Sequence, residues 1–164
     1  MAKQRAPAPL SAAAQRTRLN RVLRIAEQMG FVGRVEYRHV YSRSGGGQYV
    51  QGGSPDEDQL IAYAEAFEKD SDPEDYSLES IVAHERGHQI LARHPRVASL
   101  VAGRISMIGE EVLASVIGAL LSPTAADRHN LLSKAVFELV IRGEDKDVAE
   151  RQIFNLRDIL EQVI

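Results

Sequence analysis

The feature that most constrains this chain is the stretch from Ile81 to His94, which reads IVAHERGHQILARH. Its apolar spacing predicts a helix, and residues four apart lie on the same face of a helix. His84 and His88 therefore point in the same direction and can bind one zinc ion together. They also interrupt the apolar stripe of Ile81 and Leu91, so both imidazoles face the buried side and need partners. A metal-free pair of hydrogen-bonded core histidines is the alternative to a zinc site.

Glu85 lies between the two histidines, about 100° round the helix from His84. A carboxylate in that position can take a proton from a water whose pKa zinc has lowered to about 7, and pass it to a leaving amine. The motif therefore predicts a zinc-dependent metallopeptidase that hydrolyses peptide bonds with Glu85 as the general base. The alternative is a catalytically weak or inactive module that keeps the fold for protein binding or regulation. Glu85 favours the enzyme, because a binding module needs no general base.

The third zinc ligand has to come from elsewhere in the chain, because catalytic zinc usually has three protein ligands and one open position. The sequence contains no cysteine, which leaves histidine and carboxylate as ligand types. Glu111 and Glu110 are the first two candidates, and we favour Glu111. The residues on its helical face are small and allow a close approach to the histidine helix, namely Ala114, Ser115 and Gly118. Glu110 shares its face with the larger Leu113, Ile117 and Leu121.

This combination resembles the zinc motif of gluzincin metallopeptidases, which join HExxH to a downstream helix bearing a glutamate ligand. The matching residues are His84-Glu85-x-x-His88 and Glu111-x-x-Ala114-Ser115. The ending Leu120-Leu121-Ser122-Pro123 is similar to the ImmA/IrrE branch, in which LLxP follows the glutamate helix. The resemblance covers roughly residues 75–123. It implies a zincin-like fold, a Zn²⁺ cofactor held by His84, His88 and Glu111, and hydrolysis of a peptide or protein substrate.

His94 is the alternative third ligand from the histidine helix itself. The spacing His84-Glu85-x-x-His88-x5-His94 resembles the metzincin zinc motif. Metzincins have a glycine at the position of Leu91, where the chain turns sharply, and leucine disfavours left-handed backbone. We therefore expect His94 to be an exposed residue near the negative end of the helix dipole.

Similar enzymes bind the oxyanion of the transition state with a downstream histidine or tyrosine. No tyrosine follows His88 in the sequence, which leaves His129 as the candidate for this catalytic role. Arg104 and Arg128 are weaker candidates. A surface position at the start of a helix is the alternative for His129.

The order of the patterns predicts an α+β fold of the zincin-like type. A first helix is expected from Gln15 to the stop at Gly30. Residues 31–51 alternate in a strand pattern around three glycines at 45–47, which predicts a hairpin. The contested stretch at 60–67 is expected to be a strand, because a third strand completes a small, partly antiparallel sheet.

Four helices are expected after the sheet. Ser77 should cap the HExxH helix, which Pro95 ends. The glutamate helix should run from about Arg104 to Leu121 and be central, because it is apolar on almost every side. Residues 125–142 and 146–163 should form a C-terminal helical hairpin.

Length and charge indicate a single domain. A chain of 164 residues can build one core and is too short for two domains. We expect a flexible basic tail at residues 1–14 and one metallopeptidase domain at 15–164, in which the C-terminal helices at 124–164 could mediate homo-oligomerisation. No apolar run is long enough for a membrane span or a signal core. The basic residues before Glu27 could contact nucleic acid or resemble an organelle transit peptide, but a solvated tail is the expectation, so no nucleic-acid partner is expected. A cytoplasmic protein without a membrane partner is the expectation.

Overall fold

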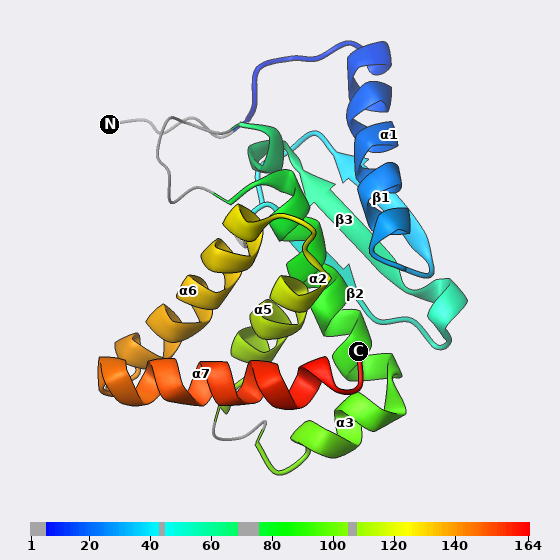
Figure 1. Cartoon of the computed structure of the whole chain (residues 1–164). Helices are drawn as coiled ribbons and strands as arrows, with labels where there is room; N and C mark the ends of the chain where they lie inside the picture. The colour runs from blue at the N-terminus through cyan, green and yellow to red at the C-terminus, as the bar shows by residue number, and fades with distance from the viewer. Residues whose placement is uncertain (1–5, 43–44, 69–75, 105–107) are drawn as a thin grey trace.

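Figure 1 shows the computed structural model, which describes residues 6–42, 45–68, 76–104 and 108–164. These residues form an α+β fold in which helix α1 and a small three-stranded sheet lie beside a layer of helices. The chain order is α1 (Ala12–Gln28), β1 (Arg34–Arg38), β2 (Gly47–Val50), η1 (Pro55–Glu57), β3 (Gln59–Tyr63), η2 (Ala64–Phe67), α2 (Leu78–Arg93), α3 (Pro95–Val101), α5 (Glu110–Leu121), α6 (Ala125–Ile141) and α7 (Lys146–Glu161). No helix in these described ranges is long and apolar enough to cross a membrane.

The sheet has the order β1-β3-β2, with β1 parallel and β2 antiparallel to the central strand. The predicted third strand is confirmed at Gln59–Tyr63, after which the chain turns into η2 instead of continuing to Phe67. The predicted hairpin between the first two strands is wrong, because β3 lies between them. Residues 60–63 of β3 are all buried, as a strand with two sheet neighbours and covered faces should be.

Helix α1 begins at Ala12, three residues earlier than the sequence pattern indicated. Ser11 caps it, since the Ser11 side chain accepts a hydrogen bond from the backbone of Ala14 at 3.1 Å. Part of the predicted flexible tail packs on the domain, because Pro7 is buried and the Ala8 carbonyl accepts a hydrogen bond from His39 at 2.7 Å. Residues 1–5 of that prediction lie outside the described residues.

Two apolar clusters meet along α2. One joins α1 and the sheet to the first half of α2 and includes Val22, Leu60 and Val82. The other joins the second half of α2 to α3, α5, α6 and α7, and includes Leu113 and Ile153. The HExxH residues lie in the middle of α2, so the packing on both sides fixes their direction.

The ends of α2 follow the sequence prediction. Ser77 caps the helix by accepting a hydrogen bond from the backbone of Ser80 at 3.0 Å, and Pro95 follows its last residue, Arg93, by two positions. Asp127 at the start of α6 accepts hydrogen bonds from the hydroxyls of Ser77 at 2.6 Å and Ser80 at 3.0 Å. This contact ties α6 to the first turn of α2.

The helix that carries Glu111 is shorter than predicted. Helix α5 begins at Glu110 and not near Arg104, because Gly109 adopts φ 94° directly before it and breaks the helical backbone. The separate helix α3 was not predicted, and residues 105–107 of the expected helix lie outside the described residues. The two C-terminal helices α6 and α7 are confirmed at almost the predicted bounds.

Candidate metal centre

Helices α2 and α5 approach each other more closely than side chains normally allow. A methyl group added at Gly87 would stand 2.3 Å from the Ala114 carbonyl oxygen, and one added at Gly118 would stand 2.9 Å from the backbone of Ala83. The small-residue face predicted for the Glu111 helix therefore does bring the two backbones together. Glu111 lies one turn before Ala114 on the same face, so the close contact carries its carboxylate to the histidines.

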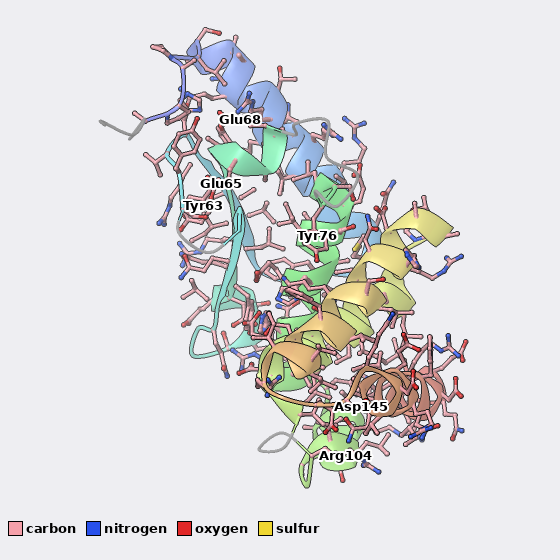
Figure 2. The ribbon with its side chains drawn as sticks, turned by 90° about the vertical axis from the view of Figure 1, so that its left-hand side faces the viewer. Tyr63, Glu65, Glu68, Tyr76, Arg104 and Asp145 are labelled. Carbon is pink, nitrogen blue, oxygen red and sulfur yellow. The ribbon has the colours of Figure 1, made fainter. Side chains whose placement is uncertain are left out.

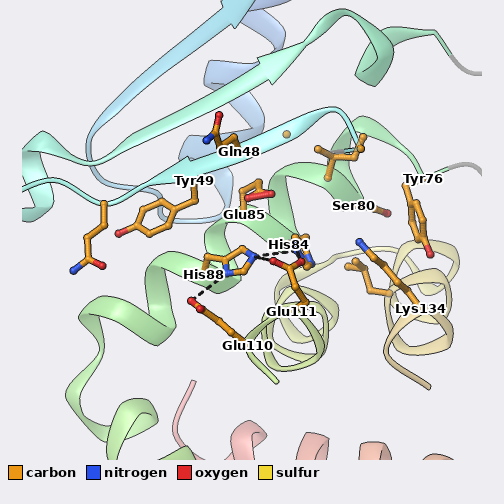
Figure 3. A pocket seen from close by; sticks show the side chains of 15 residues that line it. Gln48, Tyr49, Tyr76, Ser80, His84, Glu85, His88, Glu110, Glu111 and Lys134 are labelled. Atoms are coloured by element: carbon orange, nitrogen blue, oxygen red, sulfur yellow. Dashed lines mark hydrogen bonds and ion pairs between the residues drawn. The ribbon is translucent and has the colours of Figure 1, made fainter. Parts of the chain in front are cut away.

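Three side chains converge at this contact. The Nε2 atoms of His84 and His88 lie 3.2 Å apart, the Glu111 Oε2 atom lies 2.9 Å from the first, and the Glu111 Oε1 atom lies 3.0 Å from the second. Figure 3 shows the three side chains turned toward one another. Ligand atoms bound at about 2.0–2.2 Å in a tetrahedral site are separated by about 3.3 Å. The spacing and the donor types, two imidazoles and a carboxylate, therefore fit a zinc ion with one further position open.

The other ring nitrogen of each histidine also has a partner. The Nδ1 atom of His84 lies 2.9 Å from the buried Ser115 hydroxyl, and the Nδ1 atom of His88 lies 3.4 Å from the Glu110 carboxylate. Partners at Nδ1 fix the ring orientation and the tautomer that leaves Nε2 free to bind a metal. Glu110 therefore supports a ligand, whereas Glu111 stands in the position of one.

Burial and hydrogen bonds shift the pKa values of the three side chains in different directions. Burial lowers the pKa of His84, which keeps that imidazole neutral. Hydrogen bonds from His84 and then from His88 hold the pKa of Glu111 well below its usual value, so its carboxylate is charged. Burial acts to lower the pKa of His88. The hydrogen bond to Glu111 and the charges of nearby carboxylates together outweigh burial, so the pKa of His88 is raised.

Glu85 is the buried acid beside the two histidines. One ligand-type atom each from His84, Glu85 and His88 lies within 4.8 Å of the others. Burial raises the pKa of Glu85 to about 7, against an opposing effect of His88 and a backbone hydrogen bond from Tyr49. The carboxylate is held under strand β2, where a methyl group added at Gly47 would meet its Cγ at 3.1 Å. A carboxylate with this pKa can exchange a proton near neutral pH. Glu111 lies between the two Nε2 atoms, which makes it the better candidate for a ligand.

A buried ion pair holds strand β2 over the histidine helix. Asp58 is fully buried and accepts hydrogen bonds from Arg93 at 2.7 Å, Gln89 at 3.0 Å and the Tyr49 hydroxyl at 2.8 Å. Burial acts to raise the pKa of Asp58, but these hydrogen bonds, with Arg93 contributing most, hold it below its usual value. Gln89 and Arg93 follow His88 on α2 and Tyr49 belongs to β2, so the network fixes the strand relative to the site.

A cleft of about 670 Å³ opens over the cluster between β2, α2, α5 and α6 (Figure 3). Its wall includes Gln48 and Tyr49 on β2 and Lys134 on α6, together with Tyr76. Figure 2 shows Tyr76 at the start of α2 on the side of α6, and the Lys134 ammonium lies 5.2 Å from the centre of its ring. Tyr76 and Lys134 could not be predicted as part of the site, because no local motif contains them and only the packing of α6 on α2 brings them together.

The remaining candidates lie away from the cleft. His94 is half-buried at the end of α2 and caps α3 by accepting a hydrogen bond from the backbone of Val97 at 3.3 Å. His129 is exposed on α6 and does not line the cleft, so its predicted oxyanion role has no geometric basis. Arg104 and Arg128 donate to the carbonyls of Leu100 and Ser122, at 2.7 and 3.0 Å, and do not reach the cleft either.

Comparison of the chain with models of known families, with curated proteins and with solved structures finds no match. The candidate function therefore depends on the chemistry of the site itself.

Proposed function

We propose that this protein is a zincin-like, zinc-dependent metallopeptidase of the gluzincin type, with His84, His88 and Glu111 as the metal ligands. The observation that carries the proposal is the convergence of two Nε2 atoms and one carboxylate at 2.9–3.2 Å. The partners of both Nδ1 atoms, Ser115 and Glu110, support it, because metal-binding histidines usually have such partners.

The chemistry assigned to the site is hydrolysis of a peptide bond. When bound, zinc supplies a Lewis acid that lowers the pKa of a water to about 7 and polarises the substrate carbonyl. Glu85 accepts the proton of the attacking water at its carboxylate and delivers it to the leaving amine. Its buried position under β2 keeps this carboxyl group poised between its two protonation states near neutral pH.

Strand β2 orients the substrate in this scheme. It lies at an edge of the described sheet, paired on one side with β3, and its residues Gly47, Gln48 and Tyr49 line the cleft. A peptide in extended conformation can lie along such an edge and present its carbonyl to the metal centre. An exposed strand edge of this kind favours a peptide or protein substrate.

The direct test of this function is the substitution Glu85→Gln. Glutamine keeps the shape of the side chain and leaves the three ligands intact, so the zinc content should be unchanged. Cleavage of a peptide library, measured by mass spectrometry, should fall by about a hundredfold to ten-thousandfold, the usual contribution of a general acid-base group.

Two results would contradict the proposal. Equal cleavage by the unsubstituted protein and Glu85→Gln at equal zinc content would remove Glu85 as the base. An absence of cleavage by both proteins, with zinc bound, would favour the non-catalytic binding module.

A further inference from the structure

Lys134 on α6 is the single positively charged lysine or arginine among the described residues that line the cleft. The other ionisable residues of the described wall, apart from the two tyrosines, are the two histidines, Glu85, Glu110 and Glu111. In Figure 3, Lys134 and Tyr76 lie at one end of the cleft and Glu110 at the other, with His84 and Glu111 between them. The cleft is therefore electrostatically asymmetric along its length.

Within the described parts of the chain, Lys134 forms no ion pair with a carboxylate. Its ammonium group contacts the face of the Tyr76 ring instead, in a cation-π arrangement. Lys134 lines the same cleft as His84 and Glu85 (Figure 3). Lys134 is a half-buried residue whose ammonium group is oriented by a ring and lies in the wall of the cleft, so it is placed to bind a negatively charged group of a ligand.

We propose that Lys134, held by Tyr76, binds a carboxylate of the substrate next to the scissile bond, so that the cleft selects peptides with an acidic group on that side. The carboxylate can be the free C-terminus of the peptide or the side chain of an aspartate or glutamate. Glu110 at the opposite end repels a second acidic group, which favours one orientation of the substrate. This inference rests on the proposed peptidase function, because it names the substrate class of the same site.

The test measures binding and does not require cleavage. The probe is a short peptide of alanine and leucine with a neutral fluorophore at its N-terminus. It is made with a free C-terminus and with an amidated C-terminus. The amidated peptide is also made with a single glutamate, or a single glutamine as its neutral counterpart, at each position in turn. Binding is followed by fluorescence anisotropy on zinc-loaded Glu85→Gln protein, and on the same protein with Lys134→Met or Lys134→Arg. Lys146→Met is the matched control, because it removes the same charge from α7 outside the cleft.

The protein with Lys134 should bind at least one peptide that carries a carboxylate about tenfold more tightly than the matching peptide with an amide in its place, as expected for a charge-assisted hydrogen bond. Lys134→Met should remove that preference and leave the affinity of the amide peptides unchanged, while Lys134→Arg and Lys146→Met should keep it. A preference for the free C-terminus indicates a carboxypeptidase-like substrate, and a preference for an internal glutamate indicates an acidic side chain.

The inference is overturned if no carboxylate peptide is preferred, or if Lys134→Met weakens acidic and amide peptides equally. The second result would assign Lys134 to contacts with the peptide backbone. Zinc content and cleavage are measured separately on the protein with Glu85 intact, so a failure of the peptidase proposal can be told apart from a failure of this one.

Discussion

Replacing Gly87 by alanine should weaken zinc binding although the residue supplies no ligand atom. The new methyl carbon would lie 2.3 Å from the Ala114 carbonyl oxygen. Close carbon-oxygen contacts are normally about 3.3–3.6 Å, so α2 and α5 must separate by about 1 Å at this point. Glu111 moves with α5, and metal-ligand distances tolerate only about 0.2 Å of error. We expect the zinc affinity to fall by about 10–100-fold, the range found when groups that orient metal ligands are disturbed.

The stability of the metal-free protein should change much less. Overpacking costs about 1–3 kcal/mol, while alanine gains about 1 kcal/mol over glycine inside a helix. The free energy of unfolding should therefore fall by only about 0–2 kcal/mol. Zinc affinity is measured by competition with a chromogenic chelator, and unfolding by denaturant titration of the metal-free protein.

Gly103→Ala is the matched control, because no atom of the described residues, apart from its chain neighbours, lies within 4 Å of the methyl group added there. It should bind zinc as tightly as the unsubstituted protein. If Gly87→Ala also binds zinc with unchanged affinity, the close approach of α2 and α5 does not position Glu111 and the reasoning fails.

Two further substitutions test the network behind the site and the alternative ligand. Asp58→Asn should lower the free energy of unfolding by about 2 kcal/mol, because a buried acceptor of several hydrogen bonds loses its charge. The pKa of Asp58 is lower in the folded than in the unfolded protein, so its stabilisation is complete above pH about 4 and is lost as the pH falls below that value. Acid titrations of stability should accordingly be steeper for the unsubstituted protein than for Asp58→Asn, and parallel curves would contradict the assignment. His94→Ala should keep its zinc and lose about 1 kcal/mol of stability with the cap of α3, whereas loss of zinc would restore His94 as a ligand.

The centre of the site could be predicted from the sequence because helical periodicity determines it locally. The four-residue spacing of His84 and His88 places both imidazoles on one face wherever the helix packs. The small residues after Glu111 predicted a close helix contact. The short distance between the backbones of α2 and α5 at Gly87 and Gly118 agrees with that prediction. These are short-range relations that a linear sequence retains.

The strand order could not be predicted in the same way, because it depends on pairing between distant segments. Three glycines between two alternating stretches favour a hairpin locally, yet the apolar run at residues 60–63 gains more by lying between both strands. The sequence of that run contained one usable signal. Residues 60–63 are Leu, Ile, Ala and Tyr, and a continuous run of such residues is typical of a buried central strand. Lys134 and Tyr76 gave none, because they meet only through the packing of α6 against α2.

The central claim is that His84, His88 and Glu111 bind zinc, and the metal content of the purified protein tests it most directly. Protein prepared without added zinc should contain about one zinc per chain by elemental mass spectrometry, as a site with three protein ligands should retain it. Glu111→Ala should lose most of that metal while keeping its circular dichroism spectrum. Unsubstituted protein without bound metal, or Glu111→Ala with an unchanged zinc content, would contradict the account.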